Sequence, residues 1–200
     1  VHAQPSAGYI QAYPPGVREN GGQYSHGAVW ALMAQAELSQ NDPLGGGAGT
    51  DGDTAYRYFT HLSPAHRSRH PTLGAVYGIE PYVMAGDVYT QPPYVGRGGW
   101  SWYTGAAAWM HRAAVESIFG LRLSAHELSF RPCLPSHWPR AEITLERDGR
   151  RMRFILLRAA PAVALAATAD CDSQLLLRGT ALAWSTLPAR SCFVVPLLPA

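Results

Sequence analysis

The stretch PPGVRENGGQYSHGAVW, residues 14–30, places a charged pair, two adjacent glycines and a histidine directly before an apolar helical pattern. Adjacent glycines let a backbone approach a ligand closely, and Arg18 and Glu19 are suited to bind anions or hydroxyl groups. Gln23 and His26 are three residues apart, so a helix would place them on one face. His26 would then lie near the positive end of the helix dipole, which favours a bound anion. An ordinary helix-entry loop with a partly buried histidine explains the same residues, so both interpretations stay open.

A second stretch of this kind is GRGGWSWYTGAAAW, residues 96–109, in which glycines and aromatic residues precede a helical pattern. Thr104 is expected to be the N-cap of this helix, and with Gly105 it would offer a hydroxyl and free N–H groups to an anion such as phosphate. The aromatic residues either stack on sugar rings or pack at a domain junction; they are Trp100, Trp102 and Tyr103.

A third stretch, GIEPYVMAGDVY at residues 78–89, contains two carboxylates at a predicted helix start. Glu80 and Asp87 would share a helix face about 10 Å apart, and carboxylate pairs can act as general acid and base. Helix capping and solvation explain these two residues equally well. The three stretches together predict a carbohydrate site with an anion pocket beside it.

The elements that must position these residues are helical up to about residue 120. Apolar residues recur with helical spacing over 23–40, as in Val29, Leu32, Met33 and Ala36. Further helices are expected at 54–62, at 81–89 and, with the clearest apolar stripe, at 104–119, where Gly120 suits a C′ position. Pro43 and Gly45–Gly49 are expected to end the first helix, and the glycine-rich run 45–52 is interpreted as a flexible insertion.

The period of the apolar pattern changes from 3.6 to 2 after about Leu123. The short segments HELSFRP, AEITLER, RMRFILLR, AVALAATA, SQLLLRG and CFVVPL are predicted to be strands. Asp148 and Gly149 suit a type I′ hairpin turn. We therefore expect an antiparallel β unit, a sandwich of about six strands.

Composition excludes several classes of protein. A hydrophobic content of 47% over 200 residues is enough to bury a real core, and a formal charge of +2 is too small to indicate nucleic-acid binding. No apolar run approaches the ~20 residues that span a bilayer, and nothing at the N-terminus resembles a signal peptide. No spacing of cysteine and histidine matches a zinc site, and free thiols in a reducing compartment are expected for Cys133, Cys171 and Cys192.

The combination of motifs resembles glycoside hydrolase family 94, the inverting β-glucoside phosphorylases formerly classed as glycosyltransferase family 36. The motifs that carry the resemblance are PPGVRENGGQYSHGAVW, EPYVMAGDVY, PPYVGRGGWSWYTGAAAWMHRAAVESIFGLR and RPCLPSHWP. Within that family the sequence of these motifs is similar to the C-terminal phosphorylase-like domain of cyclic β-1,2-glucan synthases and to β-1,2-oligoglucan phosphorylases. The resemblance weakens after about residue 150, and the glycine-rich insertion at 43–53 departs from the family's compact connection.

The resemblance implies an α+β multidomain fragment, with the C-terminal part of an (α/α)6 barrel at 1–122 and a small antiparallel β-sandwich-like domain at 123–200. It implies phosphorolysis of a β-glucan, with β-1,2 linkages expected, to give α-glucose 1-phosphate with inversion. Phosphate is the co-substrate, and neither a cofactor nor a metal is implied. A cytoplasmic location is expected, either free or as the cytoplasmic domain of an inner-membrane protein, with β-glucan and phosphate as partners and a homodimer left open.

Individual positions take roles from the same resemblance. His26, Thr104 and Gly105 match the phosphate-binding residues. Residues expected at the sugar are Arg18, Glu19, Tyr13 and Gln23, whereas Gly86 departs from members with a longer polar side chain there.

The family's general acid, an aspartate, lies upstream of every residue here, and neither Glu80 nor Asp87 matches it. The chain, which does not begin with Met, is therefore expected to be an inactive C-terminal piece of a longer enzyme whose apolar helix faces would be left uncovered. Two alternatives stay open. One is an inverting hydrolase on the same barrel, with Glu80 or Asp87 as base, and the other is a non-catalytic carbohydrate-binding module.

Overall fold

The structure, a computed structural model, describes residues 4–40 and 52–198. Its internal contacts divide the chain into two compact units. The helical unit comprises Val1–Ala34 and Arg57–Ala113, and the β-rich unit comprises Gln35–Tyr56 and Ala114–Ala200. Two predictions concern residues outside this description. They are the end of the first helix at Pro43 and the glycine-rich insertion at 43–53, of which all but residues 52 and 53 is outside. The division into domains at 122/123 stays a prediction.

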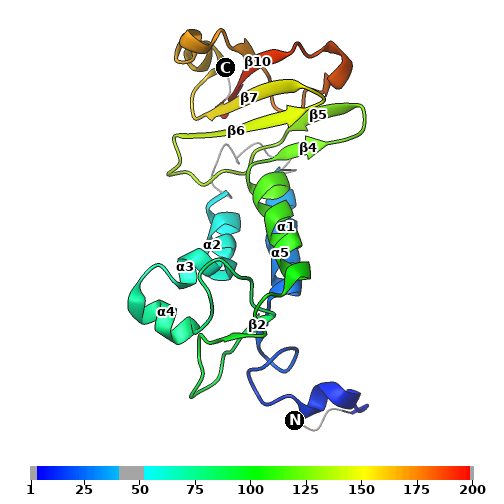
Figure 1. Cartoon of the computed structure of the whole chain (residues 1–200), viewed down its shortest axis with the longest axis vertical. Coiled ribbons are helices and arrows are strands. Elements are labelled where there is room, and N and C mark those ends of the chain that lie inside the picture. Colours follow the sequence, from blue (N-terminus) through cyan, green and yellow to red (C-terminus); the bar gives the residue numbers. More distant parts are fainter. Residues whose placement is uncertain (1–3, 41–51, 199–200) are drawn as a thin grey trace. The chain divides into compact units, whose positions relative to one another are not determined.

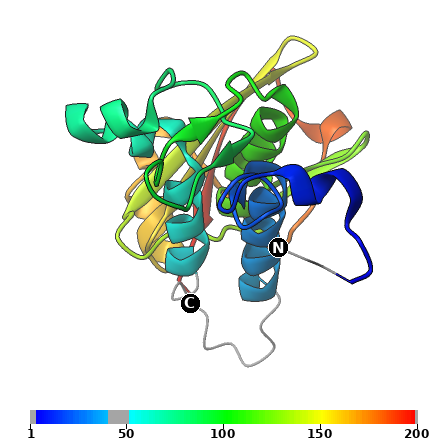
Figure 2. The same cartoon turned by 90° about the horizontal axis from the view of Figure 1, so that it is seen from below.

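The helical unit is built on short helices joined by long loops (Figure 1). Its elements are η1 (Gly8–Ala12), β1 (Gln23–Tyr24), the first part of α1 (Ser25–Gln40), the last part of α2 (Gly52–Leu62), α3 (Pro64–Arg67), α4 (Pro71–Tyr77), β2 (Asp87–Val88), β3 (Gly98–Gly99) and α5 (Thr104–Arg112). Val29 and Leu32 are fully buried, as the helical spacing predicts. Helices α1 and α5 lie side by side in both views (Figures 1 and 2), and the rings of Trp30 and Trp109 meet edge to face at 5.7 Å.

The predicted helix at 81–89 is wrong. Residues 81–86 form turns and β2 follows, as the central strand of an antiparallel three-stranded sheet in the order β1-β2-β3. The cause is that this backbone finds its hydrogen bonds in distant segments: the N–H of Gly86 donates to the carbonyls of Gly99 and Trp100, and its carbonyl accepts from Ser25. Glu80 and Asp87 therefore do not share a helix face.

The predicted helix at 104–119 forms as α5 followed by a π-helical turn, η2 (Ala113–Ile118). The predicted apolar stripe is buried at Ala106, Met110, Ala113 and Ile118, whereas its fifth member, Trp109, is half-buried. Gly120 has a φ of +83°, the left-handed conformation expected after a helix end. A Cβ there would collide with the carbonyl of Arg131, so a glycine is required on steric grounds as well.

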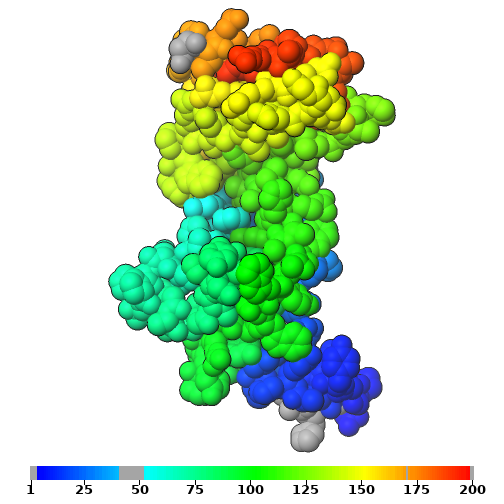
Figure 3. Space-filling model, in the orientation of Figure 1, coloured from blue at the N-terminus to red at the C-terminus, as the bar shows by residue number. Residues whose placement is uncertain are grey.

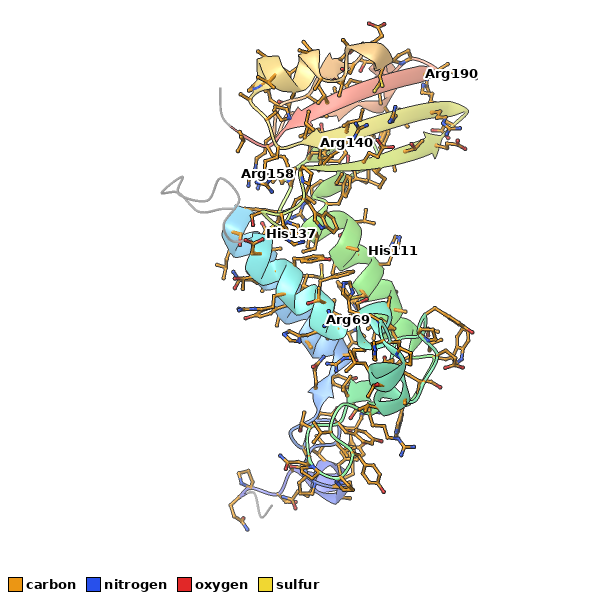
Figure 4. The ribbon with its side chains drawn as sticks, turned by 90° about the vertical axis from the view of Figure 1, so that its left-hand side faces the viewer. Arg69, His111, His137, Arg140, Arg158 and Arg190 are labelled. Carbon is orange, nitrogen blue, oxygen red and sulfur yellow. The ribbon has the colours of Figure 1, made fainter. Side chains whose placement is uncertain are left out.

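Among the described residues the β-rich unit holds two sheets, and the space-filling view shows this part of the chain as closely packed atoms (Figure 3). One sheet has the order β6 (Arg140–Arg147), β7 (Arg150–Leu157), β10 (Arg190–Pro196), β8 (Gln174–Leu175), and the other has β4 (Leu121–Leu123), β5 (Glu127–Phe130), β9 (Leu182–Ala183). Arg190 lies at the start of β10 beside Arg151, while Arg140 and Arg158 lie toward the opposite end of the sheet (Figure 4). The core includes a row of aromatic rings, with Phe154 4.8 Å from Phe130 and 5.3 Å from Phe193.

Most strand predictions in this half are confirmed, and two details are wrong. The hairpin turn at Asp148 and Gly149 has φ values of +51° and +74°, as a type I′ turn requires. The predicted strand AVALAATA is instead helix α6 (Pro161–Ala166), because Pro161 at the first helical position and alanine-rich sequence favour a helix. Strand β10 pairs parallel with both β7 and β8, so the unit is not purely antiparallel as predicted. Residues Phe193 to Pro196 of β10 are all buried, which is typical of a strand covered on both faces.

Candidate functional site

The structure brings His26 and Gly105 together from opposite ends of the helical unit's sequence. His26 lies in the first turn of α1, and Thr104 and Gly105 form the first turn of α5. A Cβ built on Gly105 would lie 3.4 Å from Cε1 and 3.7 Å from Nδ1 of the His26 ring. The first turns of two helices therefore meet at one imidazole.

Aromatic rings orient the His26 side chain. Its ring is 5.2 Å from Trp30, 6.2 Å from Trp109 and 6.5 Å from Tyr24. His26 is half-buried, whereas Thr104 and Gly105 are exposed, so the space between them is open to solvent. Such an arrangement of imidazole and N–H groups can bind an anion without a metal.

The predicted capping role of Thr104 is wrong by one position. Tyr103 is the N-cap of α5, and among the described residues no side chain caps this helix end. Tyr103 is held by two other bonds instead: its N–H donates to the carbonyl of Met84, and its hydroxyl lies 3.0 Å from that of Tyr24. The bond between the two hydroxyls, with burial as a smaller cause, raises the pKa of Tyr24.

Arg18 occupies a cage of aromatic rings. Its Cζ lies 4.2 Å from the centre of Trp100 and 5.2 Å from that of Tyr24, and the rings of Tyr13 and Tyr103 are both 5.8 Å away. Cation–π attraction of this kind partly replaces the hydration that a buried guanidinium loses. Arg18 is only 8% exposed, and its Nε lies 3.8 Å from Oε2 of the exposed Glu19.

Asp87, which was predicted as an acid or base on a helix, is instead buried beneath the Arg18 turn. It is 0% exposed, and its Oδ2 accepts the backbone N–H of Arg18 at 2.6 Å. Burial raises the pKa of this carboxyl, and the bond and positive charge from Arg18 oppose that rise. Glu80, by contrast, is half-buried and accepts a bond from Nε1 of the exposed Trp102 at 3.3 Å.

The remaining predicted sugar residues lie around the same turn. The carbonyl of Tyr13 accepts a bond from the amide of Asn20 at 2.8 Å, which fixes the segment that enters the turn. Gln23 has an amide that is already engaged at both ends, since it accepts from Arg67 at 2.9 Å and donates to the carbonyl of His61 at 3.4 Å. Gln23 therefore orders the neighbouring loop as well as lying next to the site.

Two absences apply to the parts of the chain that the structure describes. Within residues 4–40 and 52–198, no three His, Cys, Asp or Glu side chains come together as a metal site. Over the same residues, no helix combines the length and apolar character that crossing a bilayer requires. Among the same described residues, no disulfide joins Cys133, Cys171 or Cys192.

Comparison with known proteins adds independent information. Residues 2–120 match the model of the glycosyl hydrolase 94 superfamily, catalytic domain. The chain is 42% identical to the cyclic beta-(1,2)-glucan synthase NdvB of Rhizobium meliloti over 151 residues, which is 76% of this chain and 5% of that protein. It is 29% identical to solabiose phosphorylase of Paenibacillus borealis over 153 residues, which is 76% of this chain and 18% of that protein. It is 28% identical to N,N'-diacetylchitobiose phosphorylase of Vibrio proteolyticus over 144 residues, which is 71% of this chain and 16% of that protein. The chain thus spans a small part of each of these relatives.

Proposed function

Because this chain belongs to the glycosyl hydrolase 94 superfamily, we propose that it carries the phosphate cradle and part of the sugar site of an inverting glycoside phosphorylase. The relatives include a glucan synthase and disaccharide phosphorylases, which supports a phosphorylase-type glycosyl transfer. The identity to a cyclic beta-(1,2)-glucan synthase supports a β-glucan substrate with β-1,2 linkages.

The observation that carries the proposal is the meeting of His26 with the first turn of α5. Phosphate would lie between the imidazole and the N–H groups of Thr104 and Gly105, with the Thr104 hydroxyl as a further donor. Because Gly105 has no side chain, the phosphate oxygens can approach the helix end closely. Fixed donors of this kind hold the nucleophile without the cost of reorganising solvent.

The sugar would lie beside the Arg18 turn. Arg18 presents its guanidinium from the aromatic cage, and the exposed carboxylate of Glu19 accepts hydrogen bonds from hydroxyls. Tyr13 lines the same turn and is assigned to the acceptor side, with Gln23 next to it.

In the proposed reaction a phosphate oxygen attacks the anomeric carbon and forms the new C–O bond. The glycosidic C–O bond breaks with its electron pair moving to the leaving oxygen, which takes a proton from a carboxylic acid. The products are α-glucose 1-phosphate and a glucan shortened by one unit. The acid is assigned to a part of a longer polypeptide outside residues 1–200, as the family resemblance implies. Neither Asp87, which is buried against the Arg18 turn, nor Glu80, which is bonded to Trp102, takes that role. We likewise propose that the helices here belong to an (α/α)6 barrel.

The test is to incubate the full-length protein that carries this chain with a β-1,2-linked glucooligosaccharide, with and without inorganic phosphate. Phosphorus NMR should detect α-glucose 1-phosphate only when phosphate is present. Release of glucose at an equal rate without phosphate would instead identify a hydrolase. Oligosaccharide binding without turnover under either condition would identify a non-catalytic binding module.

A further inference from the structure

The carboxylate of Asp87 is fully buried and closely packed, whereas a surface acid would be solvated. It lies in the central strand of the small sheet, where Asp87 pairs with Tyr24 on one side and Gly99 on the other. A Cβ at Gly99 would lie 2.5 Å from its Oδ1, so the carboxylate fits only because position 99 is glycine. Among the described residues Oδ1 has no hydrogen-bond partner, which is costly for a buried acid and requires a compensating contact.

That contact is the backbone of Arg18, in a conformation that a non-glycine residue rarely adopts. Arg18 has a φ of +51°, and its N–H donates to Oδ2 of Asp87. The Arg18 carbonyl accepts from the N–H of Gly22 at 2.9 Å, and a Cβ on Gly22 would lie 2.6 Å from the Arg18 nitrogen. The turn is therefore held from both sides. The charged bond to Asp87 spans 69 residues of sequence, and so does the bond that the Thr90 hydroxyl donates to the Gly21 carbonyl; of the two, the bond to Asp87 acts on Arg18 itself.

The conformation decides where the guanidinium points. From this turn it enters the cage formed by Trp100 and Tyr24. Its Nε and Nη1 are buried and have no hydrogen-bond partner among the described residues, although Nε has Glu19 at 3.8 Å. A buried guanidinium needs negative charge nearby. The buried Asp87 interacts electrostatically with Arg18, whereas Glu19 is exposed to solvent.

We propose that Asp87 is a positioning residue of the sugar site, whose carboxylate holds Arg18 in the left-handed turn and balances its buried charge. The guanidinium, which the cage leaves largely buried, is then held in one orientation before the glucan binds. This inference rests on the proposed function, because it takes Arg18 as a residue that contacts the sugar. Asp87 itself touches no reacting atom.

The experiment compares Asp87→Asn with Asp53→Asn in the full-length protein. Asp53 is a matched control because its Oδ1 also accepts a backbone N–H at 2.6 Å, from Ser136, and it belongs to the β-rich unit. For D87N we expect the KM for oligosaccharide to rise about tenfold or more, the factor for one lost charge-assisted contact, with the KM for phosphate within about twofold. D53N should leave both constants unchanged even if it lowers Tm.

A double-mutant cycle with Arg18→Gly tests whether Asp87 acts through Arg18. Glycine adopts a positive φ without strain, so the turn no longer needs the clamp. D87N should then have little further effect on oligosaccharide KM in the R18G background. The proposal would be overturned if the effects of D87N and R18G on the oligosaccharide KM multiplied in the double mutant. It would also be overturned if D87N raised the KM for oligosaccharide and the KM for phosphate equally.

Two further measurements keep the outcomes distinct. If the wild type shows no phosphate-dependent turnover, the proposed function fails, and the dissociation constant for oligosaccharide measured by calorimetry still tests Asp87 through the same cycle. If D87N does not fold, Gly99→Ala crowds the carboxylate, and the Tyr89 ring beside it, without removing the charge of Asp87. This variant should reproduce the selective loss of oligosaccharide affinity. An unchanged oligosaccharide affinity in folded G99A would overturn the inference.

Discussion

Replacing Gly105 with alanine separates a structural role of this residue from a role in binding phosphate. Alanine is favoured over glycine within a helix by about 0.5–1 kcal/mol, because glycine loses more backbone freedom on folding. The new Cβ would lie 3.4 Å from His26 Cε1, which is tight but tolerable after a small shift of the ring. We therefore expect G105A to fold with a stability equal to or slightly above that of the wild type.

The same methyl group would occupy the space assigned to phosphate. Losing one charge-assisted bond costs about 1.5–3 kcal/mol, which corresponds to a roughly 10- to 100-fold rise in the KM for phosphate. The assay is glucose 1-phosphate formation by the full-length protein over a range of phosphate concentrations, with Tm measured by differential scanning fluorimetry. Gly27→Ala is the matched control, since it lies in the first turn of α1 and its Cβ would meet only Tyr24 at 3.9 Å. A KM for phosphate within about twofold of wild type in folded G105A would refute the assignment.

Two further predictions concern the stability of the β-rich unit. Hydrogen bonds from Ser136 lower the pKa of Asp53 below its ordinary value of 3.8, so their stabilisation is present above that pH and disappears as pH falls through the folded-state pKa. Ser136→Ala should therefore lower the urea midpoint at pH 7 and bring the mutant and wild-type midpoints closer together toward pH 3; an equal difference at both pH values would contradict this cause. Phe154→Ala should cost about 3–5 kcal/mol in urea unfolding, because Phe154 is fully buried between two other rings, and a loss below about 1 kcal/mol would contradict the packing described.

Features with a local cause could be predicted from the sequence. The buried face of α1, the left-handed Gly120 and the turn at Asp148 and Gly149 each follow from spacing or backbone preference over a few residues. His26 was singled out by its place at a helix start, and its proximity to Gly105 is seen only in the structure.

Features that depend on distant partners could not be predicted in this way. Asp87 was interpreted as part of a helix because its own segment lacks any sign of the Arg18 N–H that it binds 69 residues away. The available signal was Gly99, since a glycine beside an aromatic-rich loop can mark a close approach of backbone to a buried group. Similarly, β10 pairs parallel with β7 although α6 and several further elements separate the two strands in the sequence, and the apolar alternation predicted α6 as a strand.

The central claim is that His26 and the first turn of α5 hold the phosphate that attacks the glucan. It is tested most directly by the phosphate dependence of glucose 1-phosphate formation in the full-length wild type and in His26→Ala. The account predicts saturable dependence on phosphate in the wild type and a KM for phosphate at least about tenfold higher in H26A, with oligosaccharide KM little changed. Equal phosphate dependence in the two proteins, or turnover that needs no phosphate at all, would contradict it.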